Sequence, residues 1–432
     1  MSQAIPIQPI GAFTATLRPP GSKSLTNRAL LLAALADSES MLEGVLFSDD
    51  TRVMLDALRR VGFVLEIDES NERVVISGQG GRIPATHADL KLGNAGTAYR
   101  FLTAALCLGE GNYHLDGVMR MRQRPIGQLV DMLRNLGARI EFEMNQGFPP
   151  LRIHGGGLHG GELTVQPTLS SQYISALLQT APYMKTGLTL RFDGPVTSQP
   201  YVAMTLRLME RFGVSARVDA AFKTIHVSPG VYHAQAYVVE PDASNASYFL
   251  AAAAILPGSR CTIEGLGRDS FQGDVGFADV LHQMGAGLLF GDQFITIFSP
   301  PAGQSLHGIE IDLNRMPDMA QTLAAVALFA EGPTTIRNVG NLRVKETDRL
   351  DALRIELTRL GAAVRIHGDD LTITPPTGGN IRPASINTYD DHRMAMSFAI
   401  VGLRARGVTI NDPACVNKTF PDFFEYLTRL GS

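Results

Sequence analysis

The sequence predicts an α/β (α+β) protein built from six similar units, divided into two domains of three units each. Two recurring phrases support this prediction. In one phrase a helix ends on glycine and a strand follows, and in the other a polar turn opens an Ala-rich helix. Six such units fill 432 residues. That length exceeds what one compact core usually holds, which favours a split into two domains.

The first recurring phrase marks the end of a helix and the start of an alternating strand, as in LRNLGARIEF and LTRLGAAVRI. Its glycine suits the left-handed position just beyond a helix C-terminus. A short turn and a second strand usually follow. The glycines are Gly62, Gly137, Gly213, Gly285, Gly361 and Gly431. Successive copies lie 70 to 76 residues apart, which sets the length of one unit.

The second recurring phrase is a strand, a polar turn and an Ala-rich helix. These helices are apolar on nearly every face, which predicts that they are buried. The turns lie at Ser22, Asn94, Ser171, Asn245, Asp318 and Asp391. Symmetry among the units would point three buried helices in each domain the same way. Two such domains facing each other would form a cleft lined by helix N-termini, which attract anions.

The six turns carry different side chains, which a purely structural repeat does not require. The first turn offers Ser22 as an N-cap and adds Lys23, Ser24 and Arg28. Cations do not suit the positive end of a helix dipole unless a ligand brings an anion, although a solvated lysine is the alternative. For Asn245 a plain cap is the better interpretation. The other turns contribute Gly96, Arg100, Ser170, Ser171, Gln172, Asp318, Asp391, His392 and Arg393.

Three charged clusters lie outside the turns. The segment RMRQRP carries the three arginines Arg120, Arg122 and Arg124 before a helix expected to start at Pro125. In NLRVKETDRLDALRIELTRLG, Glu346 lies one turn before Leu350 and is predicted to face the packed side. An exposed, salt-bridged first turn is the alternative for that segment. Lys418 precedes a terminal amphipathic helix, where ordinary surface is the alternative.

Composition and charge exclude several classes of protein. The formal net charge of −4 gives no global basic field for nucleic acid or an anionic membrane. No apolar run approaches the ~20 residues of a membrane span, and the N-terminal residues do not resemble a signal peptide. The three cysteines lack CxxC spacing and are expected to be reduced, as in the cytoplasm. The ten histidines show no metal-ligand spacing, so no metal site is expected.

Taken together, the motifs resemble those of the EPSP synthase (3-phosphoshikimate 1-carboxyvinyltransferase) family over essentially the whole chain. The matching segments are PGSKSLTNR, LGNAGTAYR, RQRPIG, SSQY, NLRVKETDR, DDHRMAM and NKTFPDFF. The resemblance implies a two-domain inside-out α/β barrel of six βαβαββ repeats, three per domain. It assigns residues 21–240 to one domain and residues 1–20 with 241–432 to the other. The active site is then expected in the cleft between the domains.

This family transfers the enolpyruvyl group of phosphoenolpyruvate to the 5-hydroxyl of shikimate 3-phosphate and releases phosphate. The resemblance therefore implies a transferase of the shikimate pathway, which leads to chorismate and the aromatic amino acids. It implies no cofactor and no metal, and two small-molecule substrates as the only partners. It further implies a cytoplasmic monomer and inhibition by glyphosate, which occupies the phosphoenolpyruvate pocket of the family.

The resemblance also assigns roles to individual residues. Asp318 is expected to act as the base on the hydroxyl, Glu346 as the proton donor to carbon, and Lys23 on both substrates. Shikimate 3-phosphate is expected to contact Lys23, Ser24, Arg28, Ser170, Ser171, Gln172, Ser198, Asp318, Asn341 and Lys345. Phosphoenolpyruvate is expected to contact Lys23, Gly96, Arg124, Gln172, Arg349, Arg393 and Lys418. The sequence departs from the family at Gln199, where lysine is common, and at Leu342, where some members have tryptophan.

Three other interpretations compete with this one. The related UDP-N-acetylglucosamine 1-carboxyvinyltransferases have a Lys-Asn pair near the start and usually a reactive cysteine in a mobile loop. Here Ser24 follows Lys23, and the MRMRQRP segment has no cysteine. An RNA 3′-phosphate cyclase would need a broader basic surface than the net charge allows. A non-catalytic repeat scaffold would not need the unequal turns.

Overall fold

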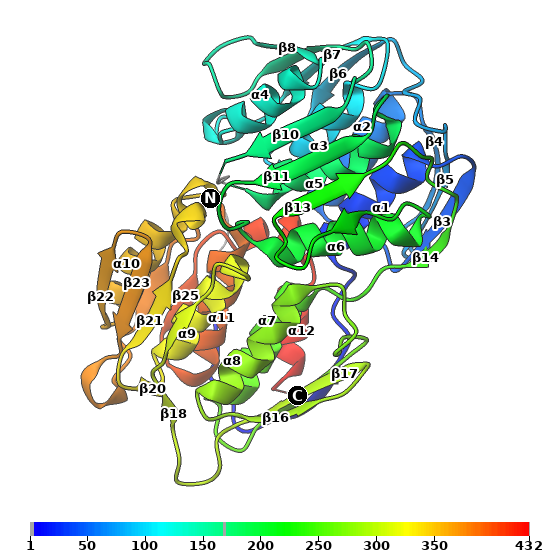
Figure 1. Cartoon of the computed structure of the whole chain (residues 1–432). Coiled ribbons are helices and arrows are strands. Elements are labelled where there is room, and N and C mark those ends of the chain that lie inside the picture. Colours follow the sequence, from blue (N-terminus) through cyan, green and yellow to red (C-terminus); the bar gives the residue numbers. More distant parts are fainter. Residues whose placement is uncertain (1–3, 167–169, 432) are drawn as a thin grey trace. The chain divides into compact units, whose positions relative to one another are not determined.

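The structure of the protein is a computed structural model that describes residues 4–166 and 170–431. It is a mixture of helices and mixed sheets, so the predicted α/β class is confirmed (Figure 1). The chain divides into two compact units, one comprising Gly21–Val239 and the other Met1–Pro20 together with Glu240–Ser432. Each unit contains sheets in which a parallel strand pair is extended by an antiparallel hairpin.

One stretch of the Gly21–Val239 unit shows the repeating pattern most clearly. Its elements are β6 (His87–Lys91), α3 (Gly96–Leu106), β7 (Asn112–Asp116), α4 (Gly127–Asn135), β8 (Arg139–Phe142) and β9 (Leu151–His154). Strands β6 and β7 are parallel because α3 carries the chain back between them. Strand β9 then pairs antiparallel with both β7 and β8. The sheet order is therefore β6-β7-β9-β8.

The same pattern precedes and follows this stretch. The following copy is β10 (Gly161–Val165), α5 (Ser171–Thr180), β11 (Leu188–Phe192), α6 (Gln199–Arg211), β12 (Arg217–Val218) and β13 (Thr224–Val227). The preceding copy is α1 (Lys23–Leu35), β3 (Glu39–Glu43), α2 (Asp49–Arg60), β4 (Val64–Asp68) and β5 (Arg73–Ser77). It takes its outer parallel strand, β14 (Ala236–Val238), from the far end of the unit.

The second unit is completed in a similar way from the start of the chain. Strand β2 (Thr14–Leu17) pairs in parallel with β15 (Arg260–Glu264), beside the hairpin of β16 (Gly287–Phe290) and β17 (Phe294–Phe298). The helices of this copy are α7 (Ala243–Ile255) and α8 (Phe277–Gln283). The strand before α1 thus belongs to the second unit, and the strand before α7 belongs to the first.

Two further copies complete the second unit. One is β19 (Glu310–Asp312), α9 (Ala320–Ala327), β21 (Thr334–Arg337), α10 (Arg349–Arg359), β22 (Ala363–His367) and β23 (Asp370–Thr374). The other is β24 (Ala384–Ile386), α11 (His392–Arg404), β25 (Val408–Ile410) and α12 (Phe423–Arg429). In the latter, β1 (Ile5–Pro6) pairs antiparallel with β25 where the other copies have a hairpin. A short parallel pair joins β18 (Leu306–His307) and β20 (Ala330–Glu331).

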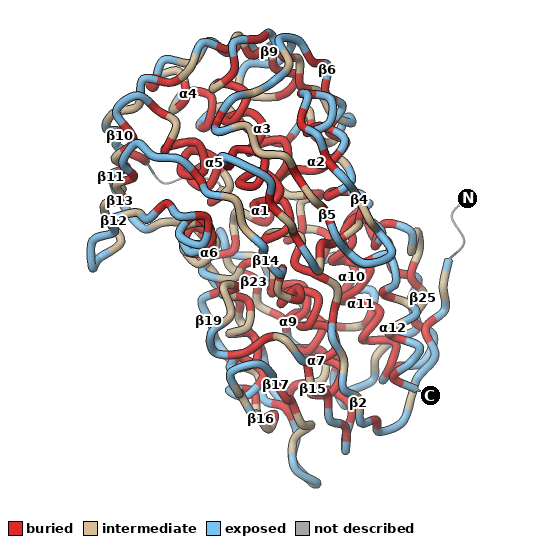
Figure 2. The backbone as a smooth tube through the Cα atoms, turned by 90° about the vertical axis from the view of Figure 1, so that its right-hand side faces the viewer, coloured by how far each residue is buried: buried red, intermediate tan, exposed pale blue. Residues whose placement is uncertain are grey.

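The Ala-rich helices form the core of each unit, as predicted. Helices α1, α3 and α5 in one unit and α7, α9 and α11 in the other are buried along nearly their whole length. Figure 2 shows the buried residues gathered along these helices. The glycines that end the helices before the hairpins have φ between 88° and 110°, which favours glycine at that position. They are Gly62, Gly137, Gly213, Gly285 and Gly361.

Within residues 4–166 and 170–431, no helix combines the length and the apolar character needed to cross a membrane. The polar turns that the sequence singled out lie at the N-terminal ends of the buried helices.

Candidate active site

Side chains cap the N-termini of four buried helices, α1, α5, α7 and α11, which fixes the turns that lead into them. Ser22 Oγ accepts a hydrogen bond from Leu25 N, as predicted, and Ser170 Oγ accepts one from Gln172 N at 3.2 Å. Asn245 is not the cap of α7, contrary to the prediction. Asp242 has that role, because its Oδ1 accepts from Asn245 N at 3.0 Å.

Lys23 is the first residue of α1, and it is not a solvated lysine. Its Nζ lies 3.2 Å from Asp50 Oδ2, and the two side chains are only 14% and 6% exposed. Asp50 lies in the first turn of α2, behind the N-cap Ser48. No pattern in the sequence links Asp50 with Lys23, although an acid in the first turn of a helix is favourable by itself.

Arg28, one turn further into α1, is buried to 2% exposure. Its Nε donates to Thr205 Oγ1 at 2.8 Å and its Nη2 to Ser175 Oγ at 3.1 Å, while its guanidinium lies 5.1 Å from the Phe101 ring centroid. Within the described part of the chain no carboxylate pairs with it, and burial lowers the pKa of Arg28 to about 10. A buried cation held only by neutral groups favours an anionic ligand nearby.

Gly96 begins α3 and leaves room for two arginines. A Cβ on Gly96 would lie 2.6 Å from Arg124 Nη2 and 2.7 Å from Arg100 Nη1. Arg124 is 3% exposed, and its Nη1 donates to Asn94 O and Asn94 Oδ1, each at 3.0 Å. Arg100 Nη1 donates to Gly96 O at 3.1 Å. The missing side chain therefore lets Arg124 lie against the start of the helix.

The remaining candidates in this unit lie at the starts of α5 and α6. Gln172 Nε2 donates to Thr97 Oγ1 at 3.1 Å, which ties the first turn of α5 to that of α3. Ser171 is the buried first residue of α5. Ser198 occupies the N-cap position of α6 without a side-chain cap bond, and its φ of 53° is a left-handed conformation that is costly for serine. Lys23, Arg28, Gly96, Arg124 and Gln172 thus all lie on first turns of the unit or contact them; we call them the Lys23 cluster.

The second unit carries the predicted acids around one buried arginine. Arg349, 1% exposed, is the first residue of α10. Its Nη1 lies 3.1 Å from Asp318 Oδ1, its Nη2 2.9 Å from Glu346 Oε2, and its Nε 2.7 Å from Asp391 Oδ2. The Arg349 guanidinium therefore contacts three carboxylates, and two of them, Asp318 and Glu346, are the expected catalytic groups. We call these four residues the Arg349 cluster.

Asp318 has two further cationic neighbours. Lys345 Nζ lies 3.6 Å from its Oδ1, and Arg393 Nη2 lies 3.2 Å from its Oδ2. Burial by itself would raise the pKa of Asp318, but Arg393, Lys345 and Arg349 together outweigh it and hold the pKa well below its usual range. Asp318 is therefore ionised in the ligand-free protein.

Three local predictions about this region and its neighbours need correction. Glu346 is buried, at 8% exposure, but it lies in the link between the short helix η5 (Gly340–Val344) and α10 rather than in a helical turn. The exposed alternative for that segment is therefore wrong, because Arg349 is buried as well. The helix expected at Pro125 starts at Gly127 instead.

The other candidates of the second unit also lie on short helices. Lys418 is 9% exposed at the end of η7 (Pro413–Lys418), so it is not ordinary surface. Asn341 lies in η5 and Lys345 directly follows it, both partly buried. Leu342, where some family members have tryptophan, is fully buried in η5 and belongs to the core.

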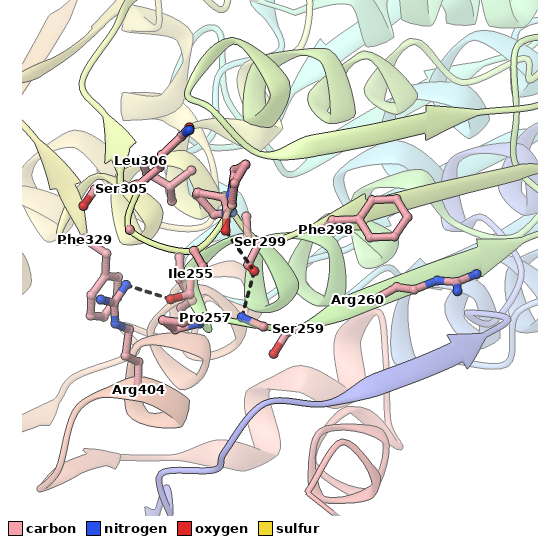
Figure 3. Close-up of a pocket in the computed structure, with 17 residues that line it drawn as sticks. Ile255, Pro257, Ser259, Arg260, Phe298, Ser299, Ser305, Leu306, Phe329 and Arg404 are labelled. Atoms are coloured by element: carbon pink, nitrogen blue, oxygen red, sulfur yellow. Dashed lines mark hydrogen bonds between the residues drawn. The ribbon is translucent and has the colours of Figure 1, made fainter.

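A separate pocket of about 540 Å³ lies at the opposite ends of the buried helices (Figure 3). It is lined by Ile255 and Arg404, the last residues of α7 and α11, and by Phe329. Arg404 Nη1 donates to Ile255 O at 2.7 Å, which satisfies a carbonyl at a helix C-terminus. The pocket does not contain any of the predicted site residues. In the part of the chain that the structure covers, no group of three or more His, Cys, Asp or Glu could hold a metal ion.

Comparisons with known proteins agree with this arrangement. The sequence matches the family profile "EPSP synthase (3-phosphoshikimate 1-carboxyvinyltransferase)" over residues 7–427. A 3-phosphoshikimate 1-carboxyvinyltransferase of Paraburkholderia phytofirmans is 49% identical over 435 residues, with 98% of each chain covered. One from Marinomonas sp. is 46% identical, with 99% of this chain and all of the other covered.

The fold agrees as well. The solved structure of EPSP synthase from Acinetobacter baumannii superposes with a TM-score of 0.82 at 27% identity, covering 100% of this chain and 98% of the other. Family profile, relatives and structure all extend over nearly the full chain and include both clusters. The chain belongs to the EPSP synthase (3-phosphoshikimate 1-carboxyvinyltransferase) family.

Proposed function

We propose that this protein transfers the enolpyruvyl group of phosphoenolpyruvate to the 5-hydroxyl of shikimate 3-phosphate, releasing phosphate. The observation that carries the proposal is the pair of carboxylates, Asp318 and Glu346, held 3.1 Å and 2.9 Å from one guanidinium. Addition and elimination at one carbon need a base and an acid within reach of the same substrate pair, and this arrangement supplies both.

The residues act in the following order. Glu346 gives a proton to the methylene carbon of phosphoenolpyruvate, and the adjacent carbon becomes an oxocarbenium-like centre. Asp318 takes the proton of the 5-hydroxyl as its oxygen attacks that centre, which forms a tetrahedral ketal phosphate. Phosphate then leaves with the proton held by Asp318, and Glu346 takes back a proton from the methyl group, which restores the double bond. The cations of both clusters hold the charged reactants together and stabilise the developing charge.

The depressed pKa of Asp318 makes it a weak base in the protein without substrates, and its role as base depends on substrate binding. In the ligand-free protein Arg393, Lys345 and Arg349 all favour its ionised form. The phosphate and carboxylate groups of the substrates compete for the same cations and partly neutralise them. The pKa of Asp318 then rises toward its usual range, and its affinity for the hydroxyl proton increases. The base is therefore strengthened by the substrates on which it acts.

We also propose that the two clusters act on one pair of substrates. The Lys23 cluster contributes Lys23, Arg28 and Arg124, and the second unit contributes Arg349, Arg393 and Lys418. In this proposal residues 21–240 form one domain and residues 1–20 with 241–432 the other, each an inside-out α/β barrel of three βαβαββ units. The protein then works as a cytoplasmic monomer with its active site between the domains.

If the clusters share their ligands, substrate binding should draw the two domains together. We expect the radius of gyration from small-angle scattering to decrease when shikimate 3-phosphate and glyphosate are both added. Inorganic phosphate alone serves as the control for ionic effects. An unchanged radius at saturating ligand would contradict a shared site.

The Gly96→Ala variant tests the phosphoenolpyruvate pocket. The added methyl would lie 2.6 Å from Arg124 Nη2 and 2.7 Å from Arg100 Nη1, so both guanidinium groups must shift. Such overpacking costs about 1–3 kcal/mol. Because glyphosate is longer than phosphoenolpyruvate, we expect its inhibition constant to rise more than the KM for phosphoenolpyruvate. Both constants are measured under one salt condition, and equal fold changes would mean that Gly96 does not discriminate between the two.

The function itself is tested by phosphate release with phosphoenolpyruvate and one acceptor at a time. We expect release with shikimate 3-phosphate and none with UDP-N-acetylglucosamine. The product is identified by mass spectrometry as the acceptor plus an enolpyruvyl group. Release with the nucleotide sugar alone would overturn the proposal in favour of the related transferase, and release with neither would exclude both.

A further inference from the structure

The turn that leads into α11 has an unfavourable backbone conformation. Tyr389 and Asp390 are consecutive non-glycine residues with φ of 57° and 54°. The left-handed region is costly for residues with a Cβ, and such conformations persist only where surrounding contacts hold them. Asp391, the N-cap of α11 and a member of the Arg349 cluster, comes directly after them.

Two contacts hold this turn against α10. Asp391 accepts from Arg349 Nε at 2.7 Å, and Tyr389 Oη donates to Glu356 Oε1 at 2.6 Å. Arg349 and Glu356 are seven residues apart, which is close to two helical turns and places them on the same face of α10. The turn is therefore fixed at both ends by one helix face.

The acceptor of the tyrosine bond is a buried carboxylate. Glu356 is 0% exposed, and its other oxygen lies 3.3 Å from Arg359 Nη1. Burial, and secondarily the bond to Glu356, raises the pKa of Tyr389 to about 12. Tyr389 is therefore protonated at neutral pH and donates its hydrogen to a carboxylate that needs a partner.

The position of this turn determines the position of two cations at Asp318. Asp391 Oδ1 accepts from Arg393 N at 2.9 Å, and Arg393 Nη2 lies 3.2 Å from Asp318 Oδ2. Both carboxylate oxygens of Asp391 also accept from Arg349, which contacts both Asp318 and Glu346. A shift of the turn would move Asp391 and, with it, the geometry of both catalytic carboxylates.

We propose that Tyr389 and Glu356 are positioning residues for the reaction: their hydrogen bond holds the strained turn so that Asp391 keeps Arg349 and Arg393 in place around Asp318 and Glu346. This inference rests on the proposed function, because it concerns the same site. Neither residue touches the substrates in this proposal. Their effect is expected on phosphoenolpyruvate, which Arg349 and Arg393 hold, more than on shikimate 3-phosphate.

The Tyr389→Phe variant keeps the ring and removes only the hydroxyl. Loss of one hydrogen bond to a charged group changes an equilibrium or rate constant by roughly tenfold or more. We therefore expect kcat/KM for phosphoenolpyruvate to fall about tenfold or more, with the Kd of shikimate 3-phosphate within about twofold of the wild-type value. Tyr426→Phe is the control, since this tyrosine of the same unit lies on α12. Rates are expressed per folded protein, with the folded fraction taken from the melting curve.

Two Glu356 variants separate positioning from packing. Glu356→Gln keeps an acceptor for Tyr389 and should retain more activity than Glu356→Met, which has none. Tyr389→Phe combined with Glu356→Met should lose no more than Glu356→Met alone, because both changes remove the same contact. Should Tyr389→Phe fold poorly, Asp390→Gly, which relieves the backbone strain, should partly restore kcat/KM when combined with it.

The possible results divide clearly. A wild-type kcat/KM in Tyr389→Phe, additive losses in the double variant, or an equal loss in Tyr426→Phe would each overturn the inference. A wild-type protein without turnover on shikimate 3-phosphate would count against the proposed function instead. Calorimetric binding of phosphoenolpyruvate would then test the inference without turnover, because weaker binding in Tyr389→Phe than in Tyr426→Phe is expected in either case.

Discussion

Asp318→Asn and Glu346→Gln are each expected to lower kcat by about a hundredfold or more, with smaller changes in substrate Kd. Each amide keeps an oxygen that can accept from Arg349, so the cluster retains its shape. What is lost is the ability to take the hydroxyl proton in one case and to supply the carbon proton in the other. The measurement is kcat from phosphate release, beside calorimetric Kd values.

Asp351→Asn is the matched control for both variants. Asp351 lies in the first turn of the same helix, α10, and pairs with Arg354 at the surface rather than with Arg349. It should leave kcat within about twofold of wild type, since surface pairs contribute little. Near-normal turnover in Asp318→Asn or Glu346→Gln would remove that residue from its assigned step.

Among the variants considered, Arg349→Met is expected to lower the free energy of unfolding most. It is also expected to lose activity. It removes the cation that faces Asp318, Glu346 and Asp391, of which Asp391 is fully buried. Breaking a buried ion pair by removing one partner costs about 3–5 kcal/mol, because an uncompensated charge stays buried. We expect that decrease in the free energy of unfolding at pH 7. We also expect kcat/KM for phosphoenolpyruvate to fall about a hundredfold or more.

The stability deficit of Arg349→Met should depend on pH in a definite direction. In the wild type the depressed pKa of Asp318 contributes stability above the unfolded pKa of aspartate, and this contribution is lost as the pH falls. In the variant Asp318 has lost one of the three cations that lower its pKa, so this contribution to stability is smaller than in the wild type. The difference in unfolding free energy between wild type and variant should therefore narrow as the pH drops from 7 toward 4 and below.

Arg354→Met provides the comparison for this variant. Arg354 lies on α10 but is 45% exposed, and its partner Asp351 is 50% exposed. The free energy of unfolding should change by about 0.5 kcal/mol or less. Denaturant unfolding of both variants at several pH values gives the result. A deficit in Arg349→Met that stays constant with pH would contradict this account of the Asp318 pKa.

The repeated architecture could be predicted because its signals are local. A glycine such as Gly137 beyond a helix end, with φ of 101°, and an Ala-rich helix such as α7 depend on neighbouring residues only. The wrong predictions concern where a helix begins and which residue takes its N-cap position. Asp242 and Asn245 both favour helix starts, and the sequence does not say which takes the cap position. Likewise η5 and the link after it interrupt the helix expected around Glu346.

The candidate residues could be placed on helix starts, but their partners could not. Lys23 pairs with Asp50 from another helix, and Arg393 approaches Asp318 from a turn 75 residues further along the chain. These pairs form through tertiary packing between distant segments, so the periodicity of the sequence does not predict them. The same holds for Tyr389, whose acceptor lies 33 residues earlier on α10. Chemistry at a single turn is readable from the sequence, whereas the network that tunes it is not.

Strand β2 precedes the first unit in the sequence but belongs to the second, and β14 precedes the second unit's helices but completes the first. This arrangement sets the order in which the two units can acquire all their strands during synthesis. Strand β14 pairs with β3, which emerges earlier, so the Gly21–Val239 unit has all its strands once residue 239 has been synthesised. Among residues 4–166 and 170–431, strand β2 pairs only with β15 and strand β1 only with β25, and the residues of both partners emerge much later. The residues of β1 and β2 therefore wait for their partners through most of synthesis, and the nascent chain must keep them from pairing wrongly during that time.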